Sequence, residues 1–286
     1  MPLKLTTSDP QLIILADLIQ QKTGLSFGSN RLDLLADRLT PLIEESGMPS
    51  AMDYYYFLKY DPEAEEEWRR VQSALAINET YFWREYSQIQ AAVDILVPRM
   101  QQSRPGVPVR IWHAACATGE EPYTMAISLL EAGRYLQGPI EIRATDFNQN
   151  ALELARKGIY RGRSFRSIPA GIQERYFTPA GKDTYQITEN VRGKVQFSYM
   201  NLLDETMMSE MVNYDIILCR NAFIYFSDAA IRRVTEWLDR SLNPEGILFV
   251  AAAESLVRLT NRLELVEVGD VFGYQKRSHS ENKHHA

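Results

Sequence analysis

The segment RIWHAACATGEEPY, at residues 110–123, constrains the fold of this chain more than any other stretch. It reads as a buried strand, a tight turn of small residues, and a helix that opens on two carboxylates. A second apolar run then ends in another carboxylate, Asp146. This succession is typical of the α/β sheets that bind nucleotides.

The polar residues of this unit indicate which kind of ligand it accepts. In nucleotide-binding sheets, an acid about 20 residues past a glycine-rich loop reaches a ribose hydroxyl, and Asp146 stands at a comparable spacing. The loop lacks the repeated glycines that a pyrophosphate needs, and Glu120 and Glu121 would repel a phosphate. A ligand with a ribose and no phosphate fits, and S-adenosylmethionine is the commonest such cofactor. The alternative is an ordinary α/β turn with solvated acids.

The composition excludes several classes of protein. Apolar residues make up 45% of the 286-residue chain, and no apolar run approaches the length of a membrane span. The first residues, MPLKLTTSDP, lack the pattern of a signal peptide. Cys116 and Cys219 have neither zinc-site spacing nor a disulfide framework, so we expect a cytoplasmic protein without a metal. The histidines of the polar tail at residues 278–286 are expected to be disordered and not to bind a metal.

The net charge of -6 lies at the front of the chain. Residues 1–85 contain 8 Lys and Arg against 14 Asp and Glu, a difference of -6, while the other 23 of each sign cancel. An acidic surface of this kind does not attract phosphate backbones, so nucleic acid is not expected as the partner. We expect a monomer that does not insert into a membrane.

The hydrophobic periodicity divides the chain into a helical part and an α/β part. Residues 1–77 form the predicted helical domain, residues 78–108 a connector with a helix at 88–102, and residues 109–286 the α/β domain. Strands are predicted at 109–113, 140–145, 214–219 and 246–252, and helices at 120–132, 148–156 and 228–241. Their alternation predicts a parallel, doubly wound sheet, to which a pair at 263–268 and 271–276 adds an antiparallel edge.

Residues 158–198 interrupt this alternation with repeated glycines and prolines. Short apolar segments at 184–187 and 195–197 lie between them. We therefore predict an inserted β-subdomain, at about residues 159–198, that contains a helix and a small hairpin.

Six motifs together resemble the CheR-type chemoreceptor glutamate methyltransferases, over nearly the whole chain. In order they are NETYFWRE, ATGEEPYTMAISL, RATDFNQNALELARKGIYR, RYF, NLL and CRNAFIYF. The combination is more specific than any one motif, because all six follow the order and spacing of that family. The resemblance implies a Rossmann-like class I methyltransferase sheet with an N-terminal all-helical domain and a small inserted β-subdomain.

The resemblance also implies which residues bind the cofactor. Asn78 and Thr80 would contact S-adenosylmethionine, and Glu121 would take its amino group. Asp146 would take the ribose hydroxyls, and the Asn201-Leu202 pair would border the adenine.

Four further residues would lie at the methyl-transfer end of the site. Arg84 would lie close to the transferred methyl and to the substrate carboxylate, while Arg220, Asn221 and Tyr225 would line this end. Arg84, Arg220 and Asn221 would therefore contact the cofactor as well. Arg84 would hold the carboxylate and Tyr225 would shape its pocket, although a core tyrosine is the alternative for the latter.

The residue types at the predicted site are consistent with a carboxylate as the methyl acceptor. A glutamate side chain has a pKa near 4.3, so at neutral pH it is already a nucleophile and needs no general base. His113 alternates within a predicted strand, which is typical of a packed or hydrogen-bonded histidine. What remains is the alignment of oxygen, methyl carbon and sulfur, which is catalysis by proximity.

The chain departs from the family pattern at three places. Gly-His-Ser before the Glu-Ser of the last long strand is replaced by Ala251-Ala-Ala253. The second helix, arginine-rich in familiar members, keeps only Arg31 and Arg38 among several acids. The hairpin between Phe177 and Val195 is shorter and lacks a glycine-rich turn, which argues against docking of a receptor's C-terminal pentapeptide.

The sequence therefore predicts an S-adenosylmethionine-dependent protein-glutamate O-methyltransferase. Its substrate would be the cytoplasmic helical bundle of a chemoreceptor, in chemotaxis or a related chemosensory pathway. Two alternatives stay open: a methyltransferase for another carboxylate, and a cofactor-binding regulatory or scaffold protein with little turnover.

Overall fold

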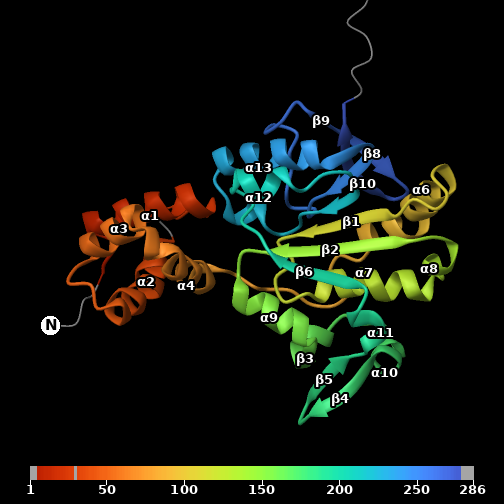
Figure 1. The fold of residues 1–286 in the computed structure, drawn as a ribbon, viewed down its shortest axis with the longest axis horizontal. Helices are drawn as coiled ribbons and strands as arrows, with labels where there is room; N and C mark the ends of the chain where they lie inside the picture. The colour runs from red at the N-terminus through yellow and green to blue at the C-terminus, as the bar shows by residue number, and fades with distance from the viewer. Residues whose placement is uncertain (1–4, 29–30, 278–286) are drawn as a thin grey trace, which may run out of the picture.

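The computed structural model describes residues 5–28 and 31–277, so the polar tail with His279, His284 and His285 lies outside the described residues. The described chain forms a bundle of helices, a larger α/β unit and a small sheet that projects from that unit (Figure 1). This arrangement confirms the predicted fold class. No helix within these residues is long and apolar enough to cross a membrane.

The N-terminal bundle consists of α1 (Pro10–Thr23), α2 (Leu32–Ser46), α3 (Ala51–Tyr60) and α4 (Glu65–Leu75). Its core contains leucines and isoleucines at the helical spacing seen in the sequence, among them the fully buried Leu12, Ile19, Leu35, Leu39 and Ile43. A three-residue 3₁₀ turn precedes α4, whose first turn carries only acids, as suits the positive end of a helix dipole.

A helical segment links the bundle to the sheet, as predicted for residues 88–102. It begins as α5 (Ser87–Ala91), continues as a π-helical turn (Ala92–Leu96) and ends as α6 (Val97–Ser103). Such π turns are rare and are found mostly inside α-helices, as here.

The main sheet has the strand order β6-β2-β1-β7-β8-β10-β9. Its strands are β1 (Val109–Ala114), β2 (Ile140–Asp146), β6 (Val195–Tyr199), β7 (Tyr214–Leu218), β8 (Leu242–Phe249), β9 (Leu263–Val268) and β10 (Val271–Lys276). The first five strands in this order pair in parallel, and β10 is antiparallel to both of its neighbours. The predicted parallel sheet with an antiparallel edge is therefore confirmed.

Helices cover both faces of this sheet because the strands carry apolar residues on both faces. Ile111 packs into the cluster formed with the linking helix and α7, while its neighbour Trp112 packs into the cluster formed with α13. Both side chains are fully buried, as expected of a central parallel strand. The covering helices are α7 (Glu120–Glu131), α8 (Arg134–Gln137), α9 (Gln149–Lys157), α12 (Glu205–Ser209) and α13 (Asp228–Ser241).

The inserted subdomain is a three-stranded sheet of order β3-β5-β4, at the bottom of Figure 1. It contains β3 (Ile159–Arg161), α10 (Ile172–Tyr176), β4 (Phe177–Gly181), β5 (Thr184–Ile187) and α11 (Glu189–Arg192). One prediction is corrected here. The segment at 195–197 was assigned to the insertion, but it lies in β6 and pairs in parallel with β2 at the edge of the main sheet.

The helical bundle contacts the carboxyl edge of the main sheet through a few specific bonds. The Asn201 side chain donates to the backbone oxygen of Lys22, and the Ser26 amide donates to the backbone oxygen of Tyr225, both at 2.8 Å. Leu25 also forms a bridge with Phe226. The bundle therefore covers the edge at which a parallel sheet gathers its ligand.

Candidate functional site

The turn after β1 brings backbone close to the carboxyl edge of the sheet. Ala115 and Ala117 have φ values of 61° and 48°, and Gly119, directly before α7, has a φ of 90°. A Cβ on Gly119 would lie 2.9 Å from that of Ala155, so only glycine fits this approach of α7 to α9. The run of small residues in the sequence thus has a steric cause.

Asp146 ends β2 and lies directly opposite this turn. Its carboxylate accepts the amides of Ala117 and Asn148, each at 2.8 Å, and its side chain is buried. Burial raises the pKa of Asp146 to about 6, even though these amides favour the charged form. A carboxylate has about four acceptor positions, so Asp146 can still accept hydroxyl donors from a ligand.

A pocket lies between Asp146 and the helical bundle. Its empty space, part of it open to solvent, is about 660 Å³, which is within the usual range for small-ligand sites. Six of the residues predicted for the site line it: Asn78, Asp146, Asn201, Leu202, Asn221 and Tyr225. The N-terminal helical part adds residues that sequence reasoning did not identify: Thr23, Leu25, Ala76 and Ile77.

The walls of this cofactor pocket fit a nucleoside. Phe147, Met200 and Leu202 provide apolar surface beside the buried carboxylate of Asp146, which suits an adenine next to a ribose. The pocket therefore satisfies the chemistry expected for S-adenosylmethionine.

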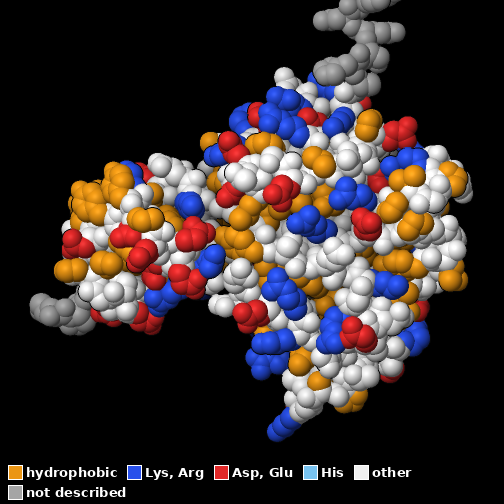
Figure 2. Space-filling model, in the orientation of Figure 1, with side chains coloured by type: hydrophobic (Ala, Val, Ile, Leu, Met, Phe, Trp, Pro, Cys, Tyr) orange, Lys and Arg blue, Asp and Glu red, His pale blue; other side chains and the backbone are white. Residues whose placement is uncertain are grey.

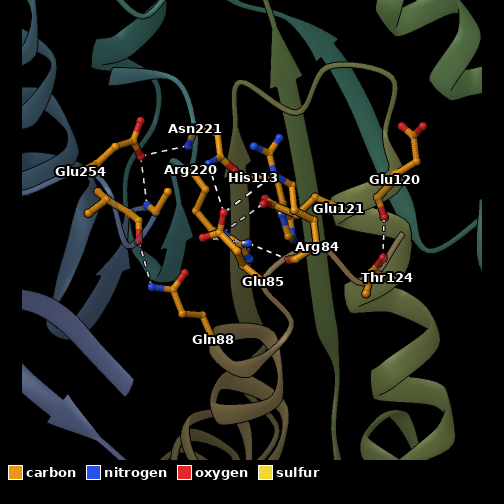
Figure 3. A network of polar contacts seen from close by, with 12 residues as sticks. Arg84, Glu85, Gln88, His113, Glu120, Glu121, Thr124, Arg220, Asn221 and Glu254 are labelled. Atoms are coloured by element: carbon orange, nitrogen blue, oxygen red, sulfur yellow. Dashed lines mark hydrogen bonds and ion pairs between the residues drawn. The ribbon is translucent and has the colours of Figure 1, made fainter. Parts of the chain in front are cut away.

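Three other predicted residues meet outside this pocket in a charged cluster (Figure 3). Arg220 follows β7 and is fully buried; its Nη2 donates to the backbone oxygen of Arg84 at 2.8 Å. Its Nε lies 3.6 Å from a carboxylate oxygen of Glu121. The Arg84 guanidinium donates to the backbone oxygen of Glu79 at 2.5 Å. Thr80 is half-buried in the segment between Asn78 and Arg84. It belongs neither to the lining of the cofactor pocket nor to the charged cluster.

Glu121 stays ionised because of its neighbours. Burial opposes its charge, but the Arg220 guanidinium and the hydrogen bond to His113 hold the pKa of Glu121 below its usual range. His113 is buried, and its Nδ1 lies 2.7 Å from Glu121. The prediction of a packed, hydrogen-bonded histidine is confirmed. No group of three or more potential ligands in residues 5–28 and 31–277 is placed to hold a metal.

The adjacent Glu120 has a different surrounding. It accepts the hydroxyls of Thr118 and Ser164 at 2.6 and 2.9 Å, and burial raises its pKa. Because Ser164 belongs to the inserted subdomain, Glu120 ties this subdomain to the start of α7. The two acids of the motif therefore point to different parts of the molecule (Figure 3).

Glu254 is a buried residue of the site to which sequence reasoning assigned no role. Its carboxylate accepts the amides of Asn221 and Ala251 at 2.9 Å and that of Ile224 at 3.2 Å. It thereby holds the loop after β7, in which Asn221 has a φ of 58°. The Glu-Ser that follows Ala251-Ala-Ala253 was the available signal, but the sequence did not show which backbone amides the acid accepts.

Tyr225 lies at the boundary between bundle and sheet. It lines the cofactor pocket, packs against the core of the bundle, and its ring lies 5.4 Å from the Arg31 guanidinium. Arg38, the other basic residue kept in α2, donates to the backbone oxygen of Ala74. Arg31 and Arg38 therefore both contact other residues of this chain.

Comparisons with known proteins agree with this geometry. Residues 78–272 match the SAM binding domain of CheR methyltransferases, and residues 11–76 match their all-alpha domain. Chemotaxis protein methyltransferase 2 of Vibrio cholerae is 33% identical over 274 residues, which are 96% of this chain and 95% of that protein. Chemotaxis protein methyltransferase 2 of Pseudomonas aeruginosa is 32% identical over 247 residues, 85% of this chain and 86% of that one.

These matches cover both the bundle and the sheet whose junction forms the cofactor pocket. The cofactor is S-adenosylmethionine, and the predicted resemblance is confirmed over most of the chain. The chain, with its helical domain closing over the carboxyl edge of a SAM-binding sheet, belongs to the CheR methyltransferase family.

Proposed function

We propose that this protein transfers a methyl group from S-adenosylmethionine to glutamate side chains on the cytoplasmic helical bundle of a chemoreceptor. The observation that carries the proposal is the pair of arginines, Arg84 and Arg220, in contact beside the cofactor pocket. Guanidinium groups bind carboxylates through directed, charge-assisted hydrogen bonds. The names of the relatives support a substrate in chemotaxis.

The reaction requires little proton chemistry. When bound, S-adenosylmethionine would supply an electrophilic methyl group on its sulfonium, positioned for in-line displacement by a carboxylate oxygen. An ionised carboxylate needs no base, and the residues here orient it and exclude water. Arg84 holds the carboxylate, and Tyr225 shapes the wall between substrate and cofactor.

The remaining assignments within this proposal concern the cofactor. Asp146 accepts the ribose hydroxyls, and the Asn201-Leu202 pair borders the adenine. Glu121, held in its charged form, takes the amino group. Asn78 and Thr80 contact the cofactor, and Arg220 and Asn221 line the methyl-transfer end.

Receptor recognition in this proposal takes place without a C-terminal tether, and the protein acts as a monomer in the cytoplasm. The hairpin of β4 and β5 has a short turn at Lys182-Asp183. Acidic side chains gather on the bundle, and basic ones on the inserted subdomain (Figure 2). Residues 156–194 contain nine Lys and Arg against three Asp and Glu, a balance suited to an acidic receptor surface.

Labelling tests the proposal directly. The protein is incubated with methyl-labelled cofactor and soluble receptor cytoplasmic fragments, and label released by mild base is measured. Base-labile methyl ester, mapped to glutamates, is the expected product. Base-stable label, or cofactor binding without label transfer, would instead indicate another acceptor or a regulatory protein.

A further inference from the structure

A second hollow opens beside the charged cluster and shares no lining residue with the cofactor pocket. Its empty space, including the part open to solvent, is about 1020 Å³. Glu85 and Glu254 both line it, together with the polar Ser87, Gln88 and Ser255. Its apolar surface comes largely from Ala251, Ala252, Val257 and Phe272. Val257 and Phe272 are 62% and 56% exposed, far more than apolar side chains of a closed core. We call this hollow the acceptor groove.

Asn221 connects the acceptor groove to the cofactor pocket. Its side chain lines the cofactor pocket, and its Nδ2 donates to a carboxylate oxygen of Glu85 at 3.3 Å. A group bound at the inner end of the groove would therefore lie next to the pocket. This is the geometry that a transfer between two ligands requires.

Glu85 already places a carboxylate at that position. One oxygen lies 3.8 Å from Nε of Arg84, and the other lies 3.8 Å from Nη2 of Arg220. These separations exceed those of a charge-assisted hydrogen bond, and the Glu85 side chain is 37% exposed. The carboxylate thus sits between the two arginines without being tightly bound to either (Figure 3).

Arg220 has unused capacity for such a carboxylate. Its side chain is fully buried; Nε lies 3.6 Å from the Glu121 carboxylate, and neither Nε nor Nη1 makes a hydrogen bond with any described residue. A buried guanidinium without full hydrogen bonding is unfavourable and is normally matched by an acceptor. The backbone at Trp83 and Glu85 has φ values of 63° and 45°, an uncommon conformation of the kind found at functional sites.

From these contacts we infer that the acceptor groove binds the glutamate side chain of the protein substrate, and that Glu85 occupies the place of its carboxylate until the substrate displaces it. This inference rests on the proposed function and identifies where its substrate binds. The aliphatic part of the incoming glutamate lies along Ala251 and Ala252. The replacement of polar residues by alanines in this chain therefore gives the groove a wall suited to methylene groups.

Exchange of the two carboxylates also favours release of the product. Methyl transfer converts the substrate carboxylate into a neutral ester, and no proton moves. A neutral ester has no ionic attraction to Arg84 and Arg220, whereas the Glu85 carboxylate is not esterified. Glu85 therefore returns to the arginines and the ester leaves.

The first test removes the charge of Glu85. Glu85→Gln should lower the KM for a receptor fragment that the wild type methylates by about fivefold, the upper range for an exposed ion pair. Inhibition by the esterified fragment should become stronger. Glu79→Gln is the matched control, because it removes a nearby exposed charge that pairs with Arg166. A KM that rises, or that stays at the wild-type value, overturns the role of Glu85.

The second test places a charge in the acceptor groove. Ala252 and Ala253 are adjacent and exposed, but only Ala252 lines the groove. Ala252→Asp should raise the KM for the receptor fragment about tenfold or more by repulsion of the acceptor carboxylate, while Ala253→Asp should not. Affinity for S-adenosylhomocysteine should be unchanged in both. Equal effects of the two substitutions on KM would contradict the placement of the groove.

A third measurement needs no receptor and no turnover. N-acetyl-L-glutamate α-amide serves as the probe, and its binding to the protein loaded with S-adenosylhomocysteine is followed by ligand-observed NMR. Binding should strengthen in Glu85→Gln and disappear in Ala252→Asp. If the wild type makes no methyl ester on any receptor, the proposed function fails. If the ester forms while the probe binds Glu85→Gln no more tightly than the wild type and still binds Ala252→Asp, the proposed function stands and only the inference fails.

Discussion

The cofactor pocket and the acceptor groove lie side by side but are built differently. In the pocket, Asp146 is buried and accepts two backbone amides at 2.8 Å. In the groove, Glu85 is partly exposed, and its contacts with two arginines are 3.8 Å long. Backbone donors held by the sheet fix the first carboxylate, whereas the side chains of Arg84, Arg220 and Asn221 surround the second.

This difference corresponds to two kinds of ligand. A cofactor presents the same ribose and adenine at each turnover, so rigid acceptors favour its binding. A protein substrate arrives as an anion and leaves as a neutral ester, so its site needs a group that can move. If this comparison holds, substitutions at the pocket will change cofactor affinity, and substitutions at the groove will change turnover or the KM for the receptor.

The largest effect is expected from Arg84→Ala. We expect turnover to fall by about a hundredfold, because the acceptor carboxylate loses its positioning partner, while affinity for S-adenosylhomocysteine falls only modestly. Steady-state kinetics and calorimetry measure the two quantities. Arg99→Ala is the control, since Arg99 pairs with Glu245 on the exposed surface. Equal losses in turnover and affinity would assign Arg84 to the cofactor pocket.

Asp146→Ala should act on the pocket instead. Loss of the acceptors for the ribose hydroxyls should weaken binding of S-adenosylhomocysteine by about tenfold or more, because hydrogen bonds to charged groups contribute roughly 1.5–3 kcal/mol each before water compensates. Asp215→Ala is a matched control: Asp215 is equally buried but binds Arg104 and the Arg110 amide away from the pocket. Unchanged calorimetric affinity in a folded Asp146 variant would show that the ribose is held elsewhere.

The pKa of Asp146 predicts a smaller effect of pH on the same affinity. Ribose hydroxyls donate to the ionised form, which predominates above the folded pKa of about 6 and is lost as the pH falls through it. Affinity for S-adenosylhomocysteine should therefore drop by about fivefold between pH 7.5 and pH 5. In Asp146→Asn this dependence should vanish. A wild-type profile that is flat across this range would mean that Asp146 is not the titrating acceptor.

The smallest effect is expected from the receptor's C-terminus. The short β4–β5 hairpin lacks a glycine-rich turn, so an isolated C-terminal pentapeptide should not bind in the micromolar range. Removal of the pentapeptide from the receptor should leave the methylation rate unchanged. Micromolar binding that is lost when residues 180–194 are altered would show that the receptor's C-terminal pentapeptide docks on this hairpin. The hairpin would then be a third binding region, beside the cofactor pocket and the acceptor groove.

The sequence was sufficient to predict the order and type of most elements, because local signals determine them. Apolar periodicity located the helices of the bundle, and the run of small residues before Glu120 marked the turn in which Ala115 and Ala117 take left-handed conformations. The segment at 195–197 was misassigned, since a short apolar run does not reveal which sheet it joins. The domain limits at 77 and 108 stay predictions.

Motifs alone predicted that Asn78, Asp146, Asn201, Asn221 and Tyr225 would meet, and they do line one pocket. What the sequence by itself determined is therefore the chemistry of the site: an acid at the end of one strand, an arginine after another, an arginine in the connector, and no general base among the matched residues. The tertiary structure decided how these groups divide between two regions. Glu85 reaches Arg220, and Lys22 reaches Asn201, only because the chain folds back over the sheet. Contacts between residues so far apart in sequence depend on the packing of whole elements, and no local pattern encodes that packing.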